Sequence, residues 1–184
     1  MTGTNQEIID ATRGWLERAV IGLNLCPFAK AVHAKGQVRF VVSDATSEEV
    51  LLADLLHELE LLYDADPDSI ETTLIVHPHV LGDFLDYNDF LGVADEAVSE
   101  LGLDGEIQVA SFHPDYRFAG SGPHDIENYS NRSPYPMLHL LRETSVARAV
   151  ASFPDASRIY ERNMASLRAL GHAGWKQLWR DDPA

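Results

Sequence analysis

Two histidines occupy matching places in the sequence, each following an apolar run and each directly followed by proline. His77 closes the run 74–76, and His113 closes the run 110–112. In open α/β sheets, ligands bind beyond the carboxyl ends of the strands, so parallel neighbouring strands would present both imidazoles at one edge. The ordinary pKa of histidine lies near neutrality, which suits a general acid or base. We therefore predict His113 and His77 as catalytic residues; the alternative is that each is a structural histidine at a strand end.

Some of the same residues could instead bind a metal ion. His77 and His79 make a His-x-His pair, which on an extended segment places both imidazoles on one face, and His113 or Asp115 could complete the set. Pro78 disrupts that extended geometry, and no further ligand stands at a diagnostic spacing. No glycine-rich phosphate loop follows any predicted strand either. We expect no metal and no other cofactor, with His77, His79 and Asp115 as weak candidate ligands.

Cys26 is the single cysteine of the chain. The segment 27–32 begins with proline and predicts a short helix, for which Cys26 would be the N-cap. A helix N-terminus and the nearby Lys30 both favour a thiolate, which makes Cys26 a candidate nucleophile. The flanking Leu25 and Phe28 support the alternative of a buried and inert thiol, because free cysteine is among the most buried residue types.

The densest cluster of polar side chains lies at 130–136, with the sequence Ser-Asn-Arg-Ser-Pro-Tyr-Pro. Ser133 can cap a helix that begins at the next residue, and backbone N–H groups would then converge with Arg132 on one anion. The predicted carboxylate or phosphate site therefore comprises Arg132, Asn131 and Ser133, with His139 and Arg142 sharing one face of the following helix. The alternative is a well-capped turn in which Arg132 is tied to an acid such as Asp115 or Asp125.

The chain resembles the bacterial domain-of-unknown-function 1415 family in three motifs. These are Asn-Leu-Cys-Pro-Phe-Ala at 24–29, Ser-Phe-His-Pro at 111–114, and the cluster at 130–136 followed by Leu-His at 138–139. The likeness extends from about residue 9 to residue 179. The motifs are long and unusual, so the resemblance is specific. It implies no activity, cofactor or substrate, because the family has none assigned.

Helical and strand patterns alternate along the chain and predict the elements that position these residues. A capping box at Thr4 and Glu7 begins a helix whose apolar stripe continues to residue 23, and a second capping box is expected at Thr46 and Glu49. Strands are predicted at 38–42, 72–77 and 107–113, and further helices at about 46–63, 83–101, 134–153 and 157–179. This order predicts an α/β fold, with a small, mostly parallel three-stranded sheet flanked by about five helices. A split α+β arrangement with an antiparallel strand is the alternative.

A long loop is predicted at about 115–132. It exceeds the usual length of a connection in a compact domain, and such loops are functional or disordered. The aromatic residues Tyr116, Phe118 and Tyr129 are expected to pin it to the body of the protein. Apolar positions on predicted helices hold the tryptophans, which we expect in the core: Trp15, Trp175 and Trp179.

Composition predicts a single domain over residues 1–184, with 45% hydrophobic and 23% charged residues. One cysteine allows no intramolecular disulfide, and neither an export signal nor a membrane span is recognisable, so we expect a cytoplasmic protein. Acidic residues outnumber basic ones 29 to 14, for a net charge of −15. Such a charge repels phosphodiester backbones and anionic lipids, and nucleic acid and membranes are therefore not expected partners.

Two functional hypotheses follow from these residues. The first is a small-molecule enzyme, a hydrolase or group transferase acting on an anionic substrate, in which Arg132 holds the anion and His113 moves protons. The second is a non-catalytic domain that binds a small anion or a partner protein. Convergence of His113, Arg132 and Cys26 in one open pocket would favour the enzyme, and their dispersal or burial in mutual hydrogen bonds would favour binding.

Overall fold

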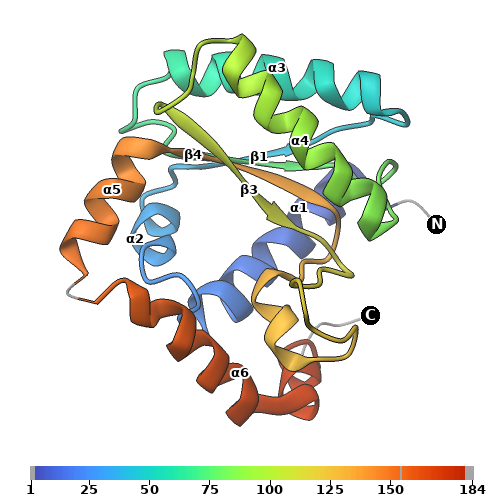
Figure 1. Cartoon of the computed structure of the whole chain (residues 1–184), viewed down its shortest axis with the longest axis vertical. Coiled ribbons are helices and arrows are strands. Elements are labelled where there is room, and N and C mark those ends of the chain that lie inside the picture. The colour runs from blue at the N-terminus through green and yellow to red at the C-terminus, as the bar shows by residue number, and fades with distance from the viewer. Residues whose placement is uncertain (1–2, 154, 181–184) are drawn as a thin grey trace.

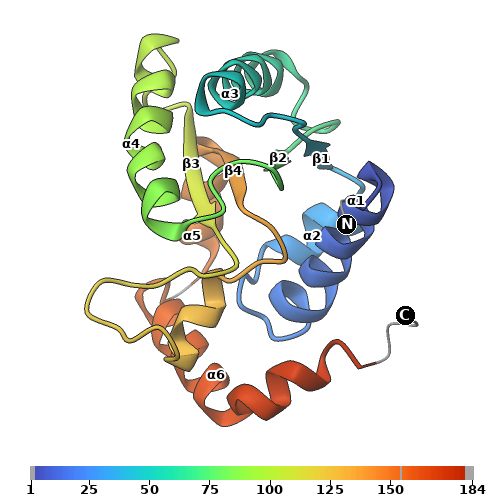
Figure 2. The same cartoon turned by 90° about the vertical axis from the view of Figure 1, so that its right-hand side faces the viewer.

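One four-stranded sheet with helices on both faces forms the centre of the computed structural model, which describes residues 3–153 and 155–180 (Figures 1 and 2). The strands are β1 (Val38–Val42), β2 (Thr72–Val76), β3 (Ile107–Phe112) and β4 (Met137–Arg142). Their spatial order is β1-β2-β4-β3. β1 pairs with β2 in parallel, whereas β4 is antiparallel to both β2 and β3. The first three strands therefore point in one direction, and the last runs between two of them in the other.

The predicted three-stranded, mostly parallel sheet was wrong because residues 137–142 form a strand and not a helix. The predicted helix 134–153 divides into β4 and α5 (Glu143–Ser152). A short apolar run fits a buried strand or a buried helix equally well by periodicity alone. Residues 137–142 form a strand because they hydrogen-bond to β2 on one side and to β3 on the other. The chain thus adopts the α+β arrangement with an antiparallel strand.

The helices α3 (Glu48–Asp64) and α4 (Phe84–Glu100) cover one face of the sheet (Figure 2). Four fully buried leucines of α3 face this layer of the core: Leu51, Leu55, Leu59 and Leu62. Burying one such side chain contributes about 1.5–3 kcal/mol. The N-cap of α3 is Ser47, whose hydroxyl accepts the Val50 N–H, so the capping box predicted at Thr46 and Glu49 was wrong.

On the other face lies α1 (Asn5–Trp15), which continues directly into a π-helical turn, η1 (Leu16–Ile21). The predicted capping box is confirmed: Thr4 accepts the Glu7 N–H, and the Glu7 carboxylate accepts the Thr4 N–H at 2.6 Å. Gly22 ends the π-helical turn, and a Cβ atom there would lie 2.2 Å from the Arg18 carbonyl oxygen. π-Helical turns are rare in proteins, and those that occur are often found at functional sites.

The C-terminal part comprises α6 (Ser157–Gln177), which kinks at Gly171, where φ is 65° and ψ is 174°. The short α2 (Ala29–Ala34) and the 3₁₀-helix η2 (Ile126–Asn131) complete the described elements. The kink redirects the last turns of α6, which carry Trp175. Within the described residues, no helix has both the length and the apolar character needed to cross a membrane.

We predict that Gly22→Ala destabilises the protein, because no side chain fits against the Arg18 carbonyl without unwinding η1. The free energy of unfolding should fall by about 2–4 kcal/mol in urea denaturation. Gly92→Ala is the matched control, since a Cβ at this exposed position of α4 meets nothing within 4 Å. It should raise stability by about 0.5–1 kcal/mol. Equal stability of Gly22→Ala and the wild type would contradict the packing argument.

Candidate functional site

The ends of β2 and β3 bring His77 and His113 to the same edge of the sheet, as expected from their spacing. Both side chains are fully buried. Tyr87 of α4 lies between them, with ring centroids 5.9 Å from His77 and 4.9 Å from His113. Its hydroxyl donates to the Met137 carbonyl at 2.6 Å and accepts the Phe112 N–H at 3.0 Å. The two histidines are therefore packed into an aromatic cluster beneath α4.

Each of these histidines is bonded to the loop between β2 and α4. His77 Nδ1 donates to the Val80 carbonyl at 3.1 Å, and His113 Nε2 donates to the Leu81 carbonyl at 3.0 Å. Leu81 has a φ of 59°, an uncommon left-handed conformation for a branched residue. Burial lowers the pKa of His77 to about 4 and also lowers the pKa of His113. This arrangement of neutral, backbone-bonded rings favours the structural alternative for both residues.

The candidate metal ligands differ in their exposure to solvent. His77 is buried, whereas His79 and Asp115 are exposed. Among residues 3–153 and 155–180, no group of three histidine, cysteine, aspartate or glutamate side chains could hold a metal ion.

The long loop is folded around the buried side chain of Asn128. Its Oδ1 accepts the Phe118 N–H at 3.0 Å and the Ser121 hydroxyl at 2.7 Å, and its Nδ2 donates to the Gly122 carbonyl at 2.8 Å. The three aromatic residues expected to pin the loop do make ring contacts: Tyr116 with Phe84, Phe118 with Tyr160, and Tyr129 with Trp175. Compact loops of this kind are frequently functional.

Arg132 braces the same loop from inside. Its Nε donates to the Tyr116 carbonyl at 3.2 Å, its Nη2 donates to the Pro123 carbonyl at 2.6 Å, and its guanidinium lies 4.6 Å from the Tyr129 ring centroid. In the described part of the chain, no carboxylate forms an ion pair with it, neither Asp115 nor Asp125. Arg132 thus supports the loop through backbone carbonyls and keeps a positive charge that no described carboxylate neutralises.

The helix N-terminus predicted beside Arg132 is absent, because residues 134–136 lead into β4. The Ser133 hydroxyl donates to the Tyr135 carbonyl at 2.7 Å instead of capping a helix. Asn131 Nδ2 donates to the Ser111 carbonyl at 3.0 Å and closes the loop against β3. The prediction that a helix dipole contributes to the anion site was therefore wrong.

His139 and Arg142 do not share a face, because residues three apart on a strand point to opposite sides. His139 is bonded through Nε2 to the Thr72 hydroxyl at 2.7 Å, and burial lowers its pKa to about 4. Arg142 Nη2 donates to the Ala65 and Ile70 carbonyls at 3.0 and 2.9 Å. Both residues brace the sheet away from Arg132.

Cys26 is exposed, so the alternative of a buried thiol was wrong. It does not cap a helix either, since α2 begins at Ala29 with Phe28 as its N-cap. The Cys26 carbonyl accepts the Ala29 N–H at 3.3 Å. The neighbouring Leu25 is the residue that turns inward, against α6.

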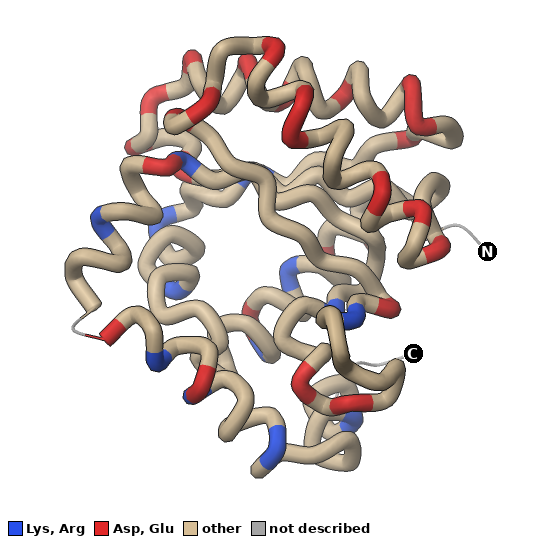
Figure 3. The backbone as a smooth tube through the Cα atoms, in the orientation of Figure 1, with Lys and Arg blue, Asp and Glu red and all other residues tan. Residues whose placement is uncertain are grey.

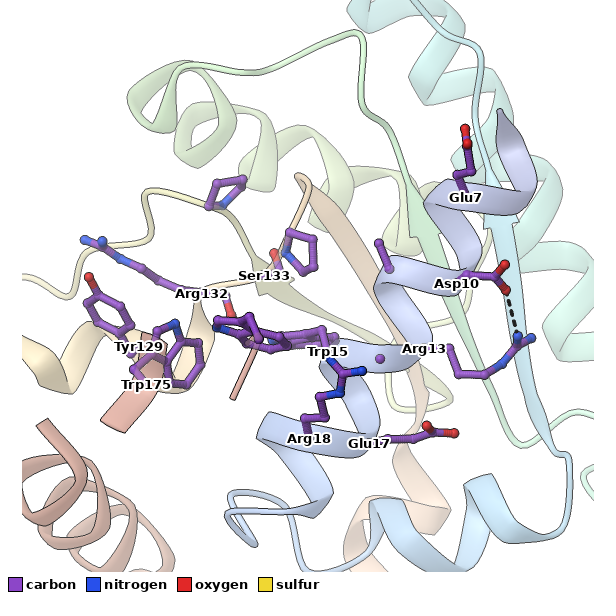
Figure 4. A pocket seen from close by; sticks show the side chains of 15 residues that line it. Glu7, Asp10, Arg13, Trp15, Glu17, Arg18, Tyr129, Arg132, Ser133 and Trp175 are labelled. Carbon is purple, nitrogen blue, oxygen red and sulfur yellow. Dashed lines mark hydrogen bonds and ion pairs between the residues drawn. The ribbon is translucent and has the colours of Figure 1, made fainter. Parts of the chain in front are cut away.

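A cleft of about 880 Å³ lies where three segments distant in sequence meet (Figure 4). α1 and η1 form one wall, the long loop forms the second, and the last turns of α6 form the third. Aromatic residues from all three segments line it: Trp15, Tyr129, Trp175 and Trp179. Charged residues also line it: Glu7, Asp10, Arg13, Glu17, Arg18 and Arg132. All three tryptophans of the chain therefore face one cleft.

The carboxylates at this cleft already have partners. Asp10 pairs with Arg13 at 3.2 Å, as Figure 4 shows, and Glu17 pairs with His33 at 2.8 Å. Glu7 belongs to the capping box of α1. Arg18 donates to the Leu178 carbonyl at 3.5 Å, which ties η1 to the end of α6. The acids of the lining are therefore engaged, whereas the charge of Arg132 is not neutralised by a described carboxylate.

Of the predicted site residues, only Arg132 and Ser133 line the cleft. His77, His113, Cys26, Asn131, His139 and Arg142 do not. Sequence reasoning assigned the tryptophans to the core, and they do pack against it. The spacing of Trp175 and Trp179, four residues apart in a segment predicted as helix, was the available signal for an aromatic wall, but it is equally typical of a core stripe.

A family profile described as "Protein of unknown function (DUF1415)" matches residues 7–177. The chain belongs to this family. The match begins at the first lining residue, Glu7, so the DUF1415 region contributes to all three walls of the cleft. Searches of curated proteins and of solved structures found no match to this DUF1415 chain.

Replacing Arg132 tests its role in the loop. We predict that Arg132→Ala lowers the free energy of unfolding by about 1–3 kcal/mol, because two charge-assisted hydrogen bonds and a cation–π contact are lost. Arg117→Ala is the control, since Arg117 is an exposed arginine of the same loop. It should change stability by less than about 0.5 kcal/mol. Equal effects of the two substitutions in urea denaturation would rule out the bracing role.

The exposure of Cys26 predicts ready chemical labelling in the folded protein. Iodoacetamide at pH 7.5 should modify it at a rate within about tenfold of that of glutathione. Mass spectrometry of the intact protein measures the adduct, and Cys26→Ser should give none. Labelling that requires denaturant would show that the thiol is protected after all.

Proposed function

We propose that this chain binds a small anionic molecule with a flat, apolar body in the cleft between α1, the long loop and α6. The single observation that carries the proposal is the lining: four aromatic side chains around a cleft of about 880 Å³, with Arg132 unmatched by a described carboxylate. Clefts of this size, mostly apolar with a few placed polar groups, are the usual form of a small-molecule site.

The aromatic lining supports a flat ligand. Tyr129 and Trp175 meet edge to face at 5.1 Å, and Trp175 and Trp179 do so at 5.8 Å. Trp15 is fixed from below by Phe112 and by the hydrogen bond from its Nε1 to the Arg132 carbonyl at 2.9 Å. These contacts hold the rings in place before a ligand arrives, which reduces the entropy lost on binding.

The distribution of charged residues supports a ligand with an anionic group. Asp and Glu gather over α3 and α4, on the other face of the sheet, whereas the helices on the cleft side carry most of the Lys and Arg (Figure 3). Arg132 retains donor capacity after its bonds to Tyr116 and Pro123, because a guanidinium has five N–H groups. A carboxylate or phosphate is the group that such a side chain recognises best.

This arrangement supports binding more than the hydrolase or group-transferase hypothesis. His113, Arg132 and Cys26 do not converge, and His77 and His113 are buried in bonds to backbone carbonyls. The carboxylates at the cleft are engaged by partners of their own. An exposed, unpaired Cys26 is compatible with the predicted cytoplasmic location, where thiols stay reduced.

Tryptophan fluorescence provides the test, because all three tryptophans line the cleft. Naphthalene-2-carboxylate should quench the emission saturably and raise the melting temperature by mass action. Naphthalene-2-carboxamide lacks the charge, and cyclohexanecarboxylate lacks the flat ring; both should bind at least about tenfold more weakly. Equal affinity for all three compounds, or none for any, would overturn the proposal.

Arg132→Gln should remove the preference for the carboxylate over the amide. Arg117→Gln removes an equal charge from the same loop outside the cleft lining and should keep that preference. An equal loss in both variants would show that only the net charge of the loop matters.

A further inference from the structure

We propose that His113 is a proton-operated clasp on the cleft: a proton on its Nδ1 atom releases Asp115 and with it the first turn of the long loop, which lowers the affinity of the cleft for its ligand. The effect on affinity rests on the function proposed above. The release of the loop does not.

His113 holds both ends of the long loop at once. Its main-chain N–H donates to the Asn131 carbonyl at 3.2 Å, and its carbonyl accepts the Ser133 N–H at 3.4 Å. At the other end of the loop, its carbonyl accepts the Tyr116 N–H at 3.1 Å, and its ring Nδ1 accepts the Asp115 N–H at 3.0 Å.

The partners of the ring fix its tautomer. Nδ1 faces a backbone N–H and must be unprotonated, so Nε2 carries the hydrogen that it donates to the Leu81 carbonyl. A second proton can only be added to Nδ1. There it would point at the Asp115 N–H, and two donors would face each other at 3.0 Å. The Asp115 hydrogen bond is therefore lost on protonation, while the Leu81 bond is kept.

The turn that this bond holds is part of the cleft. Pro114 lines the cleft directly, and the Tyr116 carbonyl is one of the two acceptors that orient Arg132. Movement of residues 114–116 therefore displaces a wall of the cleft and frees the guanidinium on which the anion depends. Protonation of a ring that does not touch the ligand is thereby transmitted to the binding site.

Charged and titratable groups around His113 come from every element packed against it. They are His77 at the end of β2, Asp83 and Tyr87 of the α4 N-terminal region, and Asp115, Tyr116 and Arg132 of the loop. Burial lowers the pKa of His113, and Arg132 lowers it further, whereas the hydrogen bond to the Leu81 carbonyl, Asp115 and Asp83 oppose the shift. The closed clasp is thus fully present above the unfolded pKa of about 6.5 and is lost as the pH falls through the lowered pKa of His113 in the folded protein.

Amide hydrogen exchange tests the release without any ligand. Between pH 7.5 and 5.0, after correction for intrinsic exchange, the protection of the Asp115 amide should fall by about tenfold in the wild type. The amides of Ile75 and Leu140 in the central strands report global unfolding, and His77 and His139 contribute to their acid sensitivity. Loss of protection at Asp115 should begin at higher pH than at these two amides. Parallel loss at all three amides would overturn the proposal.

Two variants that do not titrate form a matched pair. In His113→Asn, the side-chain oxygen stands near the position of Nδ1 and can accept the Asp115 N–H at every pH. In His113→Gln, the amide nitrogen stands near the position of Nε2 and keeps a donor for Leu81, but nothing accepts the Asp115 N–H. Asp115 should stay protected from pH 7.5 to 5.0 in His113→Asn and stay unprotected in His113→Gln. A wild-type pH profile in either variant would overturn the clasp.

Binding of naphthalene-2-carboxylate over the same pH range tests the coupling. Affinity should fall by about tenfold in the wild type and remain constant in His113→Asn, because the probe itself stays largely ionised at pH 5.0. Absence of binding at every pH would overturn the proposed function. The release of the loop would then be judged from the hydrogen exchange of the Asp115 amide alone. Constant wild-type affinity in the presence of a released Asp115 would overturn the coupling.

Discussion

One buried hydroxyl, that of Tyr87, holds the edge of the sheet on which the other features depend. It joins the Met137 carbonyl of β4 to the Phe112 N–H of β3 at the end of their ladder, where the two strands separate. Burial raises the pKa of Tyr87, so the hydroxyl keeps the hydrogen that it donates. Because α4 supplies this group from above, the helix layer fixes where β3 ends. His113 and the long loop begin at that point.

Three uncommon backbone features converge on the cleft. The π-helical turn of η1 carries Glu17 and Arg18, the long loop is folded around Asn128, and the kink at Gly171 turns the end of α6. Each of these features costs conformational free energy relative to regular structure. The hydrogen bond from Trp15 to the Arg132 carbonyl and the bond from Arg18 to the Leu178 carbonyl join the three segments. The walls of the cleft therefore support one another and are not independent elements.

Local sequence patterns predicted those parts of the fold that local interactions determine. Capping residues and leucine periodicity located α1, α3 and α4, and β-branched runs located the first three strands. β4 was missed because its side chains are apolar on both faces, and only pairing with β2 and β3 distinguishes it from a helix.

The site was predicted less well, for a related reason. The His-Pro sequence that follows two of the predicted strands correctly placed His77 and His113 at one edge of the sheet. Whether their side chains face solvent depends on α4, which no pattern in the sequence relates to them. Arg132 was identified as important, yet its acceptors are carbonyls 16 and 9 residues away in the same loop. The cleft joins α1 to the end of α6, and contacts over such a separation have no local signature.

The position of β4 also constrains how the chain can fold. It is the last of the four strands in sequence but lies between β2 and β3. These two strands therefore do not pair with each other. During synthesis, residues up to Phe112 can form the β1–β2 pair and its helices, but β3 remains unpaired until residues 137–142 leave the ribosome. Non-local pairing of this kind is slow, and the open edges of β2 and β3 are exposed to other chains in the meantime. A nascent chain of this protein is therefore most prone to aggregation while the long loop is being made, and the arrival of β4 is the step that ends that period.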